Sequence, residues 1–299
     1  MGRRKSFQEL TLKDDFMFSA VMSEESNCRE LLEMVLGFPI GKISVSKEKS
    51  IAYNPDYKSV RLDIYAKDST DRHYNVEMQS VRKSDLGKRS RYYHSQMDME
   101  SLLAGVDYSH LSDSYVIFIC DFDPFGAKKY CYTFRMNCSE ADSAELKDGT
   151  CTIFLSTCGT NQEETTESLV NFLQYAGAGA SASAEVLNDD YVRKIQAAVD
   201  RMKRDRGLEG SYMLWQETIN EYIREAQEEG RAEGRAEGRA EGRAEGRAES
   251  ILELLQEYGP VPDTVKARIM SETDMPTLSR WNKLASRVSS IEVFLHDMD

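Results

Sequence analysis

The stretch VRLDIYAKDSTDRHYNVEMQS, residues 60–80, decides the fold of this chain. Apolar and polar residues alternate in two runs, 59–67 and 73–80, and the polar segment DSTD lies between them. Alternation that is interrupted by turn-forming residues predicts two β-strands joined as a hairpin. Because a strand places successive side chains on opposite faces, Leu62 lies on one face of the first strand and Asp63 on the other.

The same alternation aligns two carboxylates. In a hairpin centred near Thr70, Asp63 lies directly opposite Glu77, and Gln79 follows on the same face. Opposed carboxylates repel each other, and a divalent cation between them removes that penalty. Mg²⁺ binds carboxylate oxygens, keeps several waters and binds substrate phosphates, so the pair indicates a metal site that acts on phosphate esters. The alternative is a solvated polar face on which the two carboxylates have no function.

A basic segment follows the hairpin directly. Residues 81–95, VRKSDLGKRSRYYHS, contain one acidic residue and five basic ones: Arg82, Lys83, Lys88, Arg89 and Arg91. The pattern over 85–105 predicts a helix that ends at Gly105, on which Arg89 and Tyr93 point the same way because they are four residues apart. Positive side chains beside a carboxylate site suit a polyanionic substrate. The alternative is a solvated helix face.

The remaining pattern predicts an α/β fold. Apolar residues at helical spacing over 11–36 predict a helical start. Further strands are expected at 43–53, 114–122, 130–136 and 151–157, and helices from about residue 163 onward.

Composition divides the chain into four parts. We expect a core at 1–175, a helical extension at 176–229 after the flexible segment AGAGASASAE, a repeat spacer at 230–249, and a small helical region at 250–299 with Trp281 and Phe294 as anchors.

Residues 230–249 are five copies of the tetrapeptide GRAE. Arg follows Arg and Glu follows Glu at i,i+4, which is unfavourable on a helix, and five interior glycines cost about 4–5 kcal/mol relative to alanine. One interpretation is a solvated, partly helical spacer. A second is a self-association helix, because the Gly and Ala rows let another helix approach closely; the apolar stripe Ile251, Leu254, Leu255 and Tyr258 would add to it. Nucleic-acid binding by the arginines is a third.

Charge and hydropathy exclude some protein classes. The net charge of −13 argues against a protein that is basic overall, although a locally basic site remains compatible with it. No apolar run of about 18 residues occurs, so we expect no membrane span. No apolar segment follows the N-terminal MGRRKS, so we expect no secretory signal and a cytoplasmic location. The six cysteines form no CxxC pair, and we expect them to be reduced.

Several separated motifs occur in an order that resembles a known family. RLDIYA, NVEMQ and KRSRYYHSQM follow one another, KDDFMFSAVM precedes them, and GVDYSHLSDSYVIFICDFDPFG and the Gly-Arg-Glu-rich repeats come after. The chain thus resembles the PD-(D/E)XK nuclease superfamily over about residues 8–250. More narrowly, it resembles the recombination-promoting nuclease group, often labelled PD-(D/E)XK nuclease family transposases.

The resemblance implies a restriction-endonuclease-like core, with a four-stranded mixed central sheet flanked by helices, followed here by a helical C-terminal tail. It also implies Mg²⁺ at the carboxylates, with Mn²⁺ as a substitute. Asp63 falls on the first metal-binding aspartate and Glu77 on the acidic position of the (D/E)XK motif. Gln79 stands where the motif usually has lysine; an amide cannot act as a general acid or base, but it can orient the attacking water.

Three further positions match the group. Asp15 matches an acidic position in the first helix, and its alternative role is a helix-start charge favoured by the dipole. Arg89 and Tyr93 match the R-x-x-x-Y of the helix after the motif, where they contact phosphate or support the site. We expect DNA phosphate contacts from the other basic residues of the segment: Arg82, Lys83, Lys88 and Arg91.

Two functions follow as expectations. The first is a metal-dependent DNA endonuclease that hydrolyses phosphodiester bonds, linked to DNA recombination or mobile-element biology. The second, motivated by Gln79 and the acidic net charge, is a catalytically weak or inactive DNA-binding or self-associating protein that keeps the nuclease fold. DNA is the expected partner in both, and the C-terminal helical tail adds a homodimer contact.

Overall fold

The computed structural model describes residues 5–51, 60–141, 144–178 and 181–298. Contacts divide the chain into two compact units, Met1–Met213 and Leu214–Asp299. Among the described residues, no helix has both the length and the apolar character needed to cross a bilayer.

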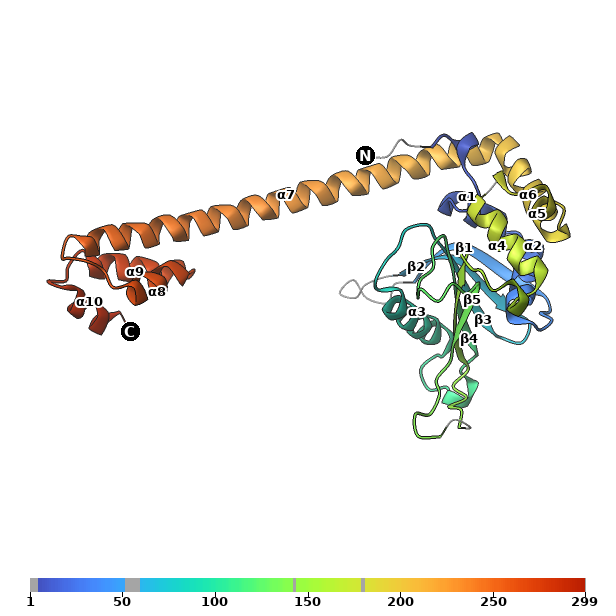
Figure 1. The fold of residues 1–299 in the computed structure, drawn as a ribbon, viewed down its shortest axis with the longest axis horizontal. Helices are drawn as coiled ribbons and strands as arrows, with labels where there is room; N and C mark the ends of the chain where they lie inside the picture. The colour runs from blue at the N-terminus through green and yellow to red at the C-terminus, as the bar shows by residue number, and fades with distance from the viewer. Residues whose placement is uncertain (1–4, 52–59, 142–143, 179–180, 299) are drawn as a thin grey trace. The chain divides into compact units, whose positions relative to one another are not determined.

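A mixed six-stranded sheet forms the centre of the first unit (Figure 1). Its strands are β1 (Ile43–Ile51), β2 (Val60–Asp68), β3 (His73–Gln79), β4 (Ser114–Cys120), β5 (Cys131–Phe134) and β6 (Thr150–Ser156). The spatial order is β1-β2-β3-β4-β6-β5; β3, β4 and β6 run parallel, and the other neighbours are antiparallel. The mixed sheet predicted from the sequence is confirmed, but among the described residues it has six strands instead of four.

The β2–β3 hairpin has the predicted register. Ile64 pairs with Val76 and Lys67 with His73, so the turn is centred at residue 70. The carboxylate of Asp68 fixes this turn: Oδ1 accepts hydrogen bonds from the backbone N–H groups of Thr70 and Arg72, at 2.8 and 3.0 Å. Its Oδ2 accepts a hydrogen bond from the Tyr74 hydroxyl at 2.8 Å. A local Asx-type arrangement of this kind holds a turn at one length.

Helices cover both faces of the sheet (Figure 1). They are α1 (Asp15–Met22), α2 (Glu25–Leu36), α3 (Leu86–Ser101), α4 (Glu167–Ala178), α5 (Ala184–Leu187) and α6 (Asp190–Arg204). Figure 1 shows α3 on one side of the sheet and α1, α2 and α4 gathered on the other. The helix expected over 85–105 is confirmed as α3, but it ends at Ser101 and Gly105 lies in the following turn, with φ 86°.

Strand β4 lies at the centre of the core. All seven of its residues are buried, as expected for a strand covered on both faces. On the α3 side, Met97 and Tyr93 of the helix pack against Val116 and Phe118 of the strand. This packing fixes α3 over β3 and β4 and thereby positions the basic segment beside the carboxylates.

The second unit has a core of its own. It comprises α7 (Arg206–Gln256), whose first turns belong to the first unit, and α8 (Asp263–Ser271), α9 (Met275–Ala285) and α10 (Ile291–Asp297). Trp281 and Phe294 are buried there, as predicted, and Ile251 and Leu255 pack against them. The predicted apolar stripe therefore packs largely within its own chain, although Tyr258 stays 41% exposed.

The GRAE repeat lies wholly inside α7. Ala244 and Ala248, from its last two copies, are buried in the core of the second unit. The first unit extends to Met213 and includes α6, which packs on α1 and α4. Two residues of the flexible segment predicted at 176–185, numbers 179 and 180, lie outside the described residues. The four-part division by composition stays a prediction.

Candidate active site

Asp63 and Glu77 meet where the β2–β3 ladder stops. Ile64 and Val76 are the last paired residues toward this end. Beyond them the side chains replace the ladder bonds: the Asp63 N–H donates to Glu77 Oε1 at 3.1 Å, and the Met78 N–H donates to Asp63 Oδ2 at 3.2 Å. Each carboxylate thus accepts a backbone hydrogen bond from the opposite strand, and these two bonds hold the pair together on the face that α3 covers.

Burial dominates the electrostatics of the pair. Glu77 is 2% exposed and Asp63 is half-buried. Desolvation raises the pKa of both carboxyl groups above their ordinary values, and each is raised further by a carboxylate neighbour, Asp15 for Asp63 and Asp63 for Glu77. Buried carboxyls with raised pKa values and a shared like charge are typical of functional sites.

Arg89 connects the carboxylate site to α3. Its guanidinium donates to Gln79 Oε1 at 2.7 Å and to the Tyr93 hydroxyl at 2.6 Å, and it forms an ion pair with Glu77 at 3.5 Å. The guanidinium also lies over the rings of Tyr93 and Phe118, at 5.3 and 5.7 Å from their centroids. The structure therefore brings together Glu77, Gln79, Arg89 and Tyr93, which the sequence placed in one site.

Asp15 reaches the same site from α1. It is the first residue of that helix. Burial and then the neighbouring Asp14 raise its pKa, while Lys83 and Arg61 lower it. Because Asp15 in turn raises the pKa of Asp63, three acidic groups share one electrostatic environment.

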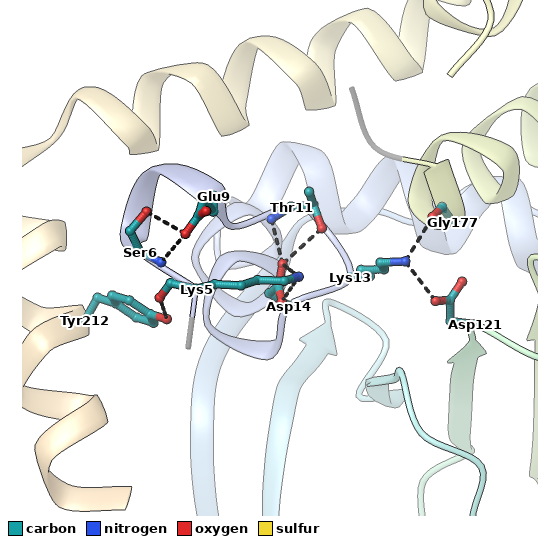
Figure 2. Close-up of polar contacts among 9 residues, drawn as sticks. All are labelled: Lys5, Ser6, Glu9, Thr11, Lys13, Asp14, Asp121, Gly177 and Tyr212. Atoms are coloured by element: carbon teal, nitrogen blue, oxygen red, sulfur yellow. Dashed lines mark hydrogen bonds and ion pairs between the residues drawn. The ribbon is translucent and has the colours of Figure 1, made fainter. Parts of the chain in front are cut away.

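The residues beside Asp15 fix α1 in place (Figure 2). Their contacts were not predicted from the sequence. Lys13 donates to Asp121 Oδ2 at 3.0 Å and to the Gly177 carbonyl at 3.2 Å. Asp14 accepts bonds from the Thr11 N–H at 2.7 Å and from Lys5 at 2.6 Å. Lys13 thereby ties the start of α1 to the end of β4, because Asp121 follows Cys120 directly.

Asp121, the ion-pair partner of Lys13, contacts the site as well. Asp121 donates its backbone N–H to the Gln79 carbonyl at 2.9 Å, and its Oδ1 accepts a bond from the Thr157 hydroxyl at 3.1 Å. Lys13 and Asp121 are 108 residues apart, so no local sequence pattern predicts their contact. The segment DFDPFG, residues 121–126, indicates only that a turn follows the buried strand.

The remaining basic residues of the segment are all exposed: Arg82, Lys83, Lys88 and Arg91. Arg82 is the most constrained, since it donates to the Asp123 carbonyl at 2.8 Å and lies over the Phe122 ring. Lys83 lies close enough to Asp15 to lower its pKa. Lys83 thereby brings positive charge to an acidic group of the site.

The donor set fits a hard divalent cation. Carboxylate oxygens are the ligands that Mg²⁺ and Mn²⁺ prefer, and the raised pKa values show that burial of the pair is not balanced by the cations nearby. Over the described ranges, no three His, Cys, Asp or Glu side chains are grouped closely enough to hold a metal by themselves. Asp63 and Glu77 would therefore share a cation with waters and substrate oxygens.

A mixed sheet flanked by helices, with paired acidic residues on adjacent strands and a basic helix beside them, is consistent with a restriction-endonuclease-like α/β fold. Comparison with known families agrees: the family described as PD-(D/E)XK nuclease family transposase matches residues 12–224. The chain belongs to this family. Searches of curated proteins and of solved structures found no significant match.

Proposed function

We propose that this protein is a metal-dependent DNA endonuclease that hydrolyses phosphodiester bonds in DNA recombination or mobile-element biology. The observation that carries the proposal is the reciprocal bonding of a half-buried and a buried carboxylate, Asp63 and Glu77, at the point where the pairing of their strands ends. Family membership supports a nuclease acting on DNA.

Asp63 and Glu77 would hold the cation, which is Mg²⁺ or, as a substitute, Mn²⁺. Asp15, whose charge acts on Asp63, would support the site. A bound divalent cation lowers the pKa of a water molecule and polarises the phosphoryl oxygen. Binding of the cation also relieves the repulsion between the two carboxylates, because both can then ionise.

Gln79 and Arg89 would act on the reacting atoms. The Gln79 amide can orient the attacking water through hydrogen bonds, in the place where the motif usually has lysine. Arg89, steadied by Tyr93, offers a guanidinium that matches phosphate geometry. Around them, Arg82, Lys83, Lys88 and Arg91 would neutralise flanking phosphates.

The test is nicking of supercoiled plasmid by the purified chain in Mg²⁺, Mn²⁺ and EDTA. We expect metal-dependent nicking that falls at least about 100-fold in Asp63→Asn and in Glu77→Gln. Glu163→Gln, which removes an exposed carboxylate, is the matched control and should nick like the parent. Full nicking by both site variants would reject the proposal.

Gln79 favours a second candidate function, a protein that binds DNA or itself but cleaves weakly or not at all. In the structure its amide oxygen is already engaged by Arg89. Retention of DNA on a filter with and without Mg²⁺ separates the candidates, because binding alone does not need Asp63. DNA binding without cleavage by the parent, together with cleavage by Gln79→Lys, would establish the second function.

We also propose a homodimer formed through the C-terminal helical tail and a cytoplasmic location. The exposed Gly row of the repeat supports the first, and six free cysteines fit a reducing compartment. Light scattering on a chain that ends near residue 225 tests the dimer; an oligomeric state unchanged by the truncation would reject it.

A further inference from the structure

One register row crosses the sheet from the candidate site toward its edge. Glu77 pairs with Phe118 on β4, Phe118 with Phe154 on β6, and Phe154 with Tyr132 on β5. Directly paired residues point to the same face, so the row lies on the side that α3 covers. Neighbouring strands are about 4.8 Å apart, and the row therefore ends roughly 14 Å from the carboxylate.

Aromatic rings fill this row without a gap. Tyr93 stacks on Phe118 at 6.1 Å between centroids, Phe118 on Phe154 at 5.2 Å, and Phe125 meets Phe154 edge-on at 5.1 Å. At the site end, the guanidinium of Arg89 lies over the first two rings. The carboxylate site and the edge of the sheet are thus joined by one continuous chain of rings, of which Phe118 and Phe154 are buried.

Only the far end of this chain of rings is open to solvent. Phe125 is 49% exposed and Phe134 is 46% exposed, and their centroids lie 5.0 Å apart. We call these two rings the aromatic shelf. Two adjacent exposed aromatic side chains in continuity with a candidate active site are a feature that core packing alone does not require.

The turn that carries Phe125 is ordered by Asp123. Its carboxylate accepts hydrogen bonds from the Phe125 N–H at 3.1 Å, the Lys128 N–H at 2.7 Å and the Tyr132 hydroxyl at 2.7 Å. Burial alone would raise the pKa of Asp123, but these bonds hold it below its ordinary value. The shelf is therefore a fixed surface that exists before any ligand arrives.

Positive charge lies at the same turn. Arg82 donates to the carbonyl of Asp123 and its guanidinium covers Phe122. A cation next to exposed rings is the combination that binds single-stranded nucleic acid, in which phosphates need neutralising and base faces need a stacking partner. In a duplex both faces of each base are already stacked, so an exposed ring gains nothing from paired DNA.

We propose that the aromatic shelf stacks unpaired bases of a DNA strand whose phosphate lies at Asp63 and Glu77. The preferred substrate is then DNA with unpaired nucleotides close to the cleaved bond. At a rise of about 3.4 Å per nucleotide, the length of the row, roughly 14 Å, corresponds to about four nucleotides of one strand. The inference rests on the proposed function for the position of the strand, but stacking itself is measurable without cleavage.

The test uses the full chain with Asp63→Asn, so that the probe stays intact. The probes are a single-stranded oligonucleotide containing 2-aminopurine, whose fluorescence is quenched by stacking, and a blunt duplex of the same sequence. Phe125→Leu combined with Phe134→Leu keeps apolar contact with Phe154 but removes the ring faces. Tyr108→Leu, which changes a ring that is 83% exposed outside the row, is the matched control.

We expect the Asp63→Asn chain to bind the single strand more tightly than the duplex and to quench the fluorescence of 2-aminopurine in the single strand. The double Leu variant should lose about ten-fold in affinity for the single strand and less than about two-fold for the duplex, and Phe125→Trp should retain binding. Equal losses for both probes, or no loss, would overturn the shelf. If the unmodified chain nicks duplex plasmid but the Leu variant binds both probes normally, the proposed nuclease function is supported and the aromatic shelf is rejected. If the bases stack on the shelf but the unmodified chain cleaves no DNA, the shelf is supported and the nuclease function is rejected.

Discussion

The carboxylates of Asp63 and Glu77 perform two tasks in the folded chain. Each accepts a backbone hydrogen bond from the opposite strand, and each would offer its other oxygen to a cation, which for Glu77 means exchanging the ion pair that Oε2 forms with Arg89 at 3.5 Å. The first task makes the pair part of the hairpin. The second leaves two like charges in a buried place, which costs free energy whenever both are ionised.

This cost predicts how stability depends on pH. Since the pKa of each carboxyl is raised in the folded chain, the folded state binds more protons than the unfolded state between the ordinary and the raised values. Stability must then fall as pH rises through that window, by up to about 1.4 kcal/mol per pH unit for each carboxyl. We expect the Tm in EDTA to fall from about pH 5 to about pH 8.

Two comparisons check the origin of this pH dependence. Asp63→Asn should flatten the fall in Tm, because one of the two charges is gone. Mg²⁺ should raise the Tm most at the alkaline end, where both carboxylates are ionised and the cation binds the folded state alone. A Tm that rises with pH in EDTA, or a metal effect equal at all pH values, would contradict the assignment.

The sequence predicted the opposed carboxylates because two simple rules suffice: a period of two along each strand and a turn centred at residue 70. The contact between Arg89 and Tyr93 followed from their helical spacing. The bond from Arg89 to Gln79 was not predicted, since it depends on how α3 crosses β3. Lys13 was missed for the same reason, because its partner Asp121 becomes a neighbour only through the topology of the sheet.

At the scale of elements, the start of α1 is the part whose placement matters most for the site. Three successive residues there have different partners. Lys13 bonds to Asp121 and Gly177, and Asp14 bonds to Lys5 and Thr11 (Figure 2). The charge of Asp15 acts on Asp63. The ion pair of Lys13 is partly buried, with its side chain 34% exposed, so it is worth more than an ordinary surface pair.

Lys13→Met should therefore affect the site through the position of Asp15. We expect a loss of about 1 kcal/mol in stability to urea and a fall of about ten-fold in nicking, with a larger fall at low Mg²⁺ than at saturating Mg²⁺. Lys5→Met, which removes the more exposed pair with Asp14, is the control and should change nicking little. Equal effects of the two variants, or a loss that Mg²⁺ does not influence, would mean that Lys13 acts on folding alone.

Helix α7 shows where local propensity fails as a guide. Summed glycine costs and like-charge pairs predict a marginal helix over the repeat, yet the helix is continuous from Arg206 to Gln256. The sum omits tertiary contacts: Ala244 and Ala248 are buried in the core of the second unit, so the end of the repeat is held by packing, and the helix can propagate from an existing nucleus.

The glycines of the repeat provide a test that separates its two interpretations. Nothing lies within 4 Å of a Cβ added at Gly234 or Gly238. Replacing both by alanine should stabilise the helix by about 1 kcal/mol per site, measured as helicity by circular dichroism during heating. If the repeat is a self-association helix, the same variant should also dissociate more readily in light scattering; an unchanged dimer with a more stable helix would favour the spacer.

For the whole molecule, the relevant fact is that each unit has its own apolar core. The first unit is centred on the sheet, and the second is centred on Trp281, whose indole N–H donates to the Met298 carbonyl at 2.9 Å. Separate cores predict separate unfolding transitions.

Trp281→Ala should destabilise the second unit by about 3–5 kcal/mol and leave the transition of the first unit in place. Calorimetry checks this, and plasmid nicking measured beside it shows whether catalysis needs the second unit. A single transition that shifts as a whole would contradict independent cores. Nicking that is lost while the first unit stays folded would indicate that cleavage requires the folded second unit.

The turn held by Asp68 restricts which insertions and deletions the β2–β3 hairpin can accept. Exposed turns normally accept small insertions and deletions. Yet a single added or lost codon that shifts β3 against β2 by one position would send Glu77 to the opposite face of the sheet, away from Asp63 and Arg89. The length of this short turn therefore matters to the site as much as the identity of the carboxylates that it aligns.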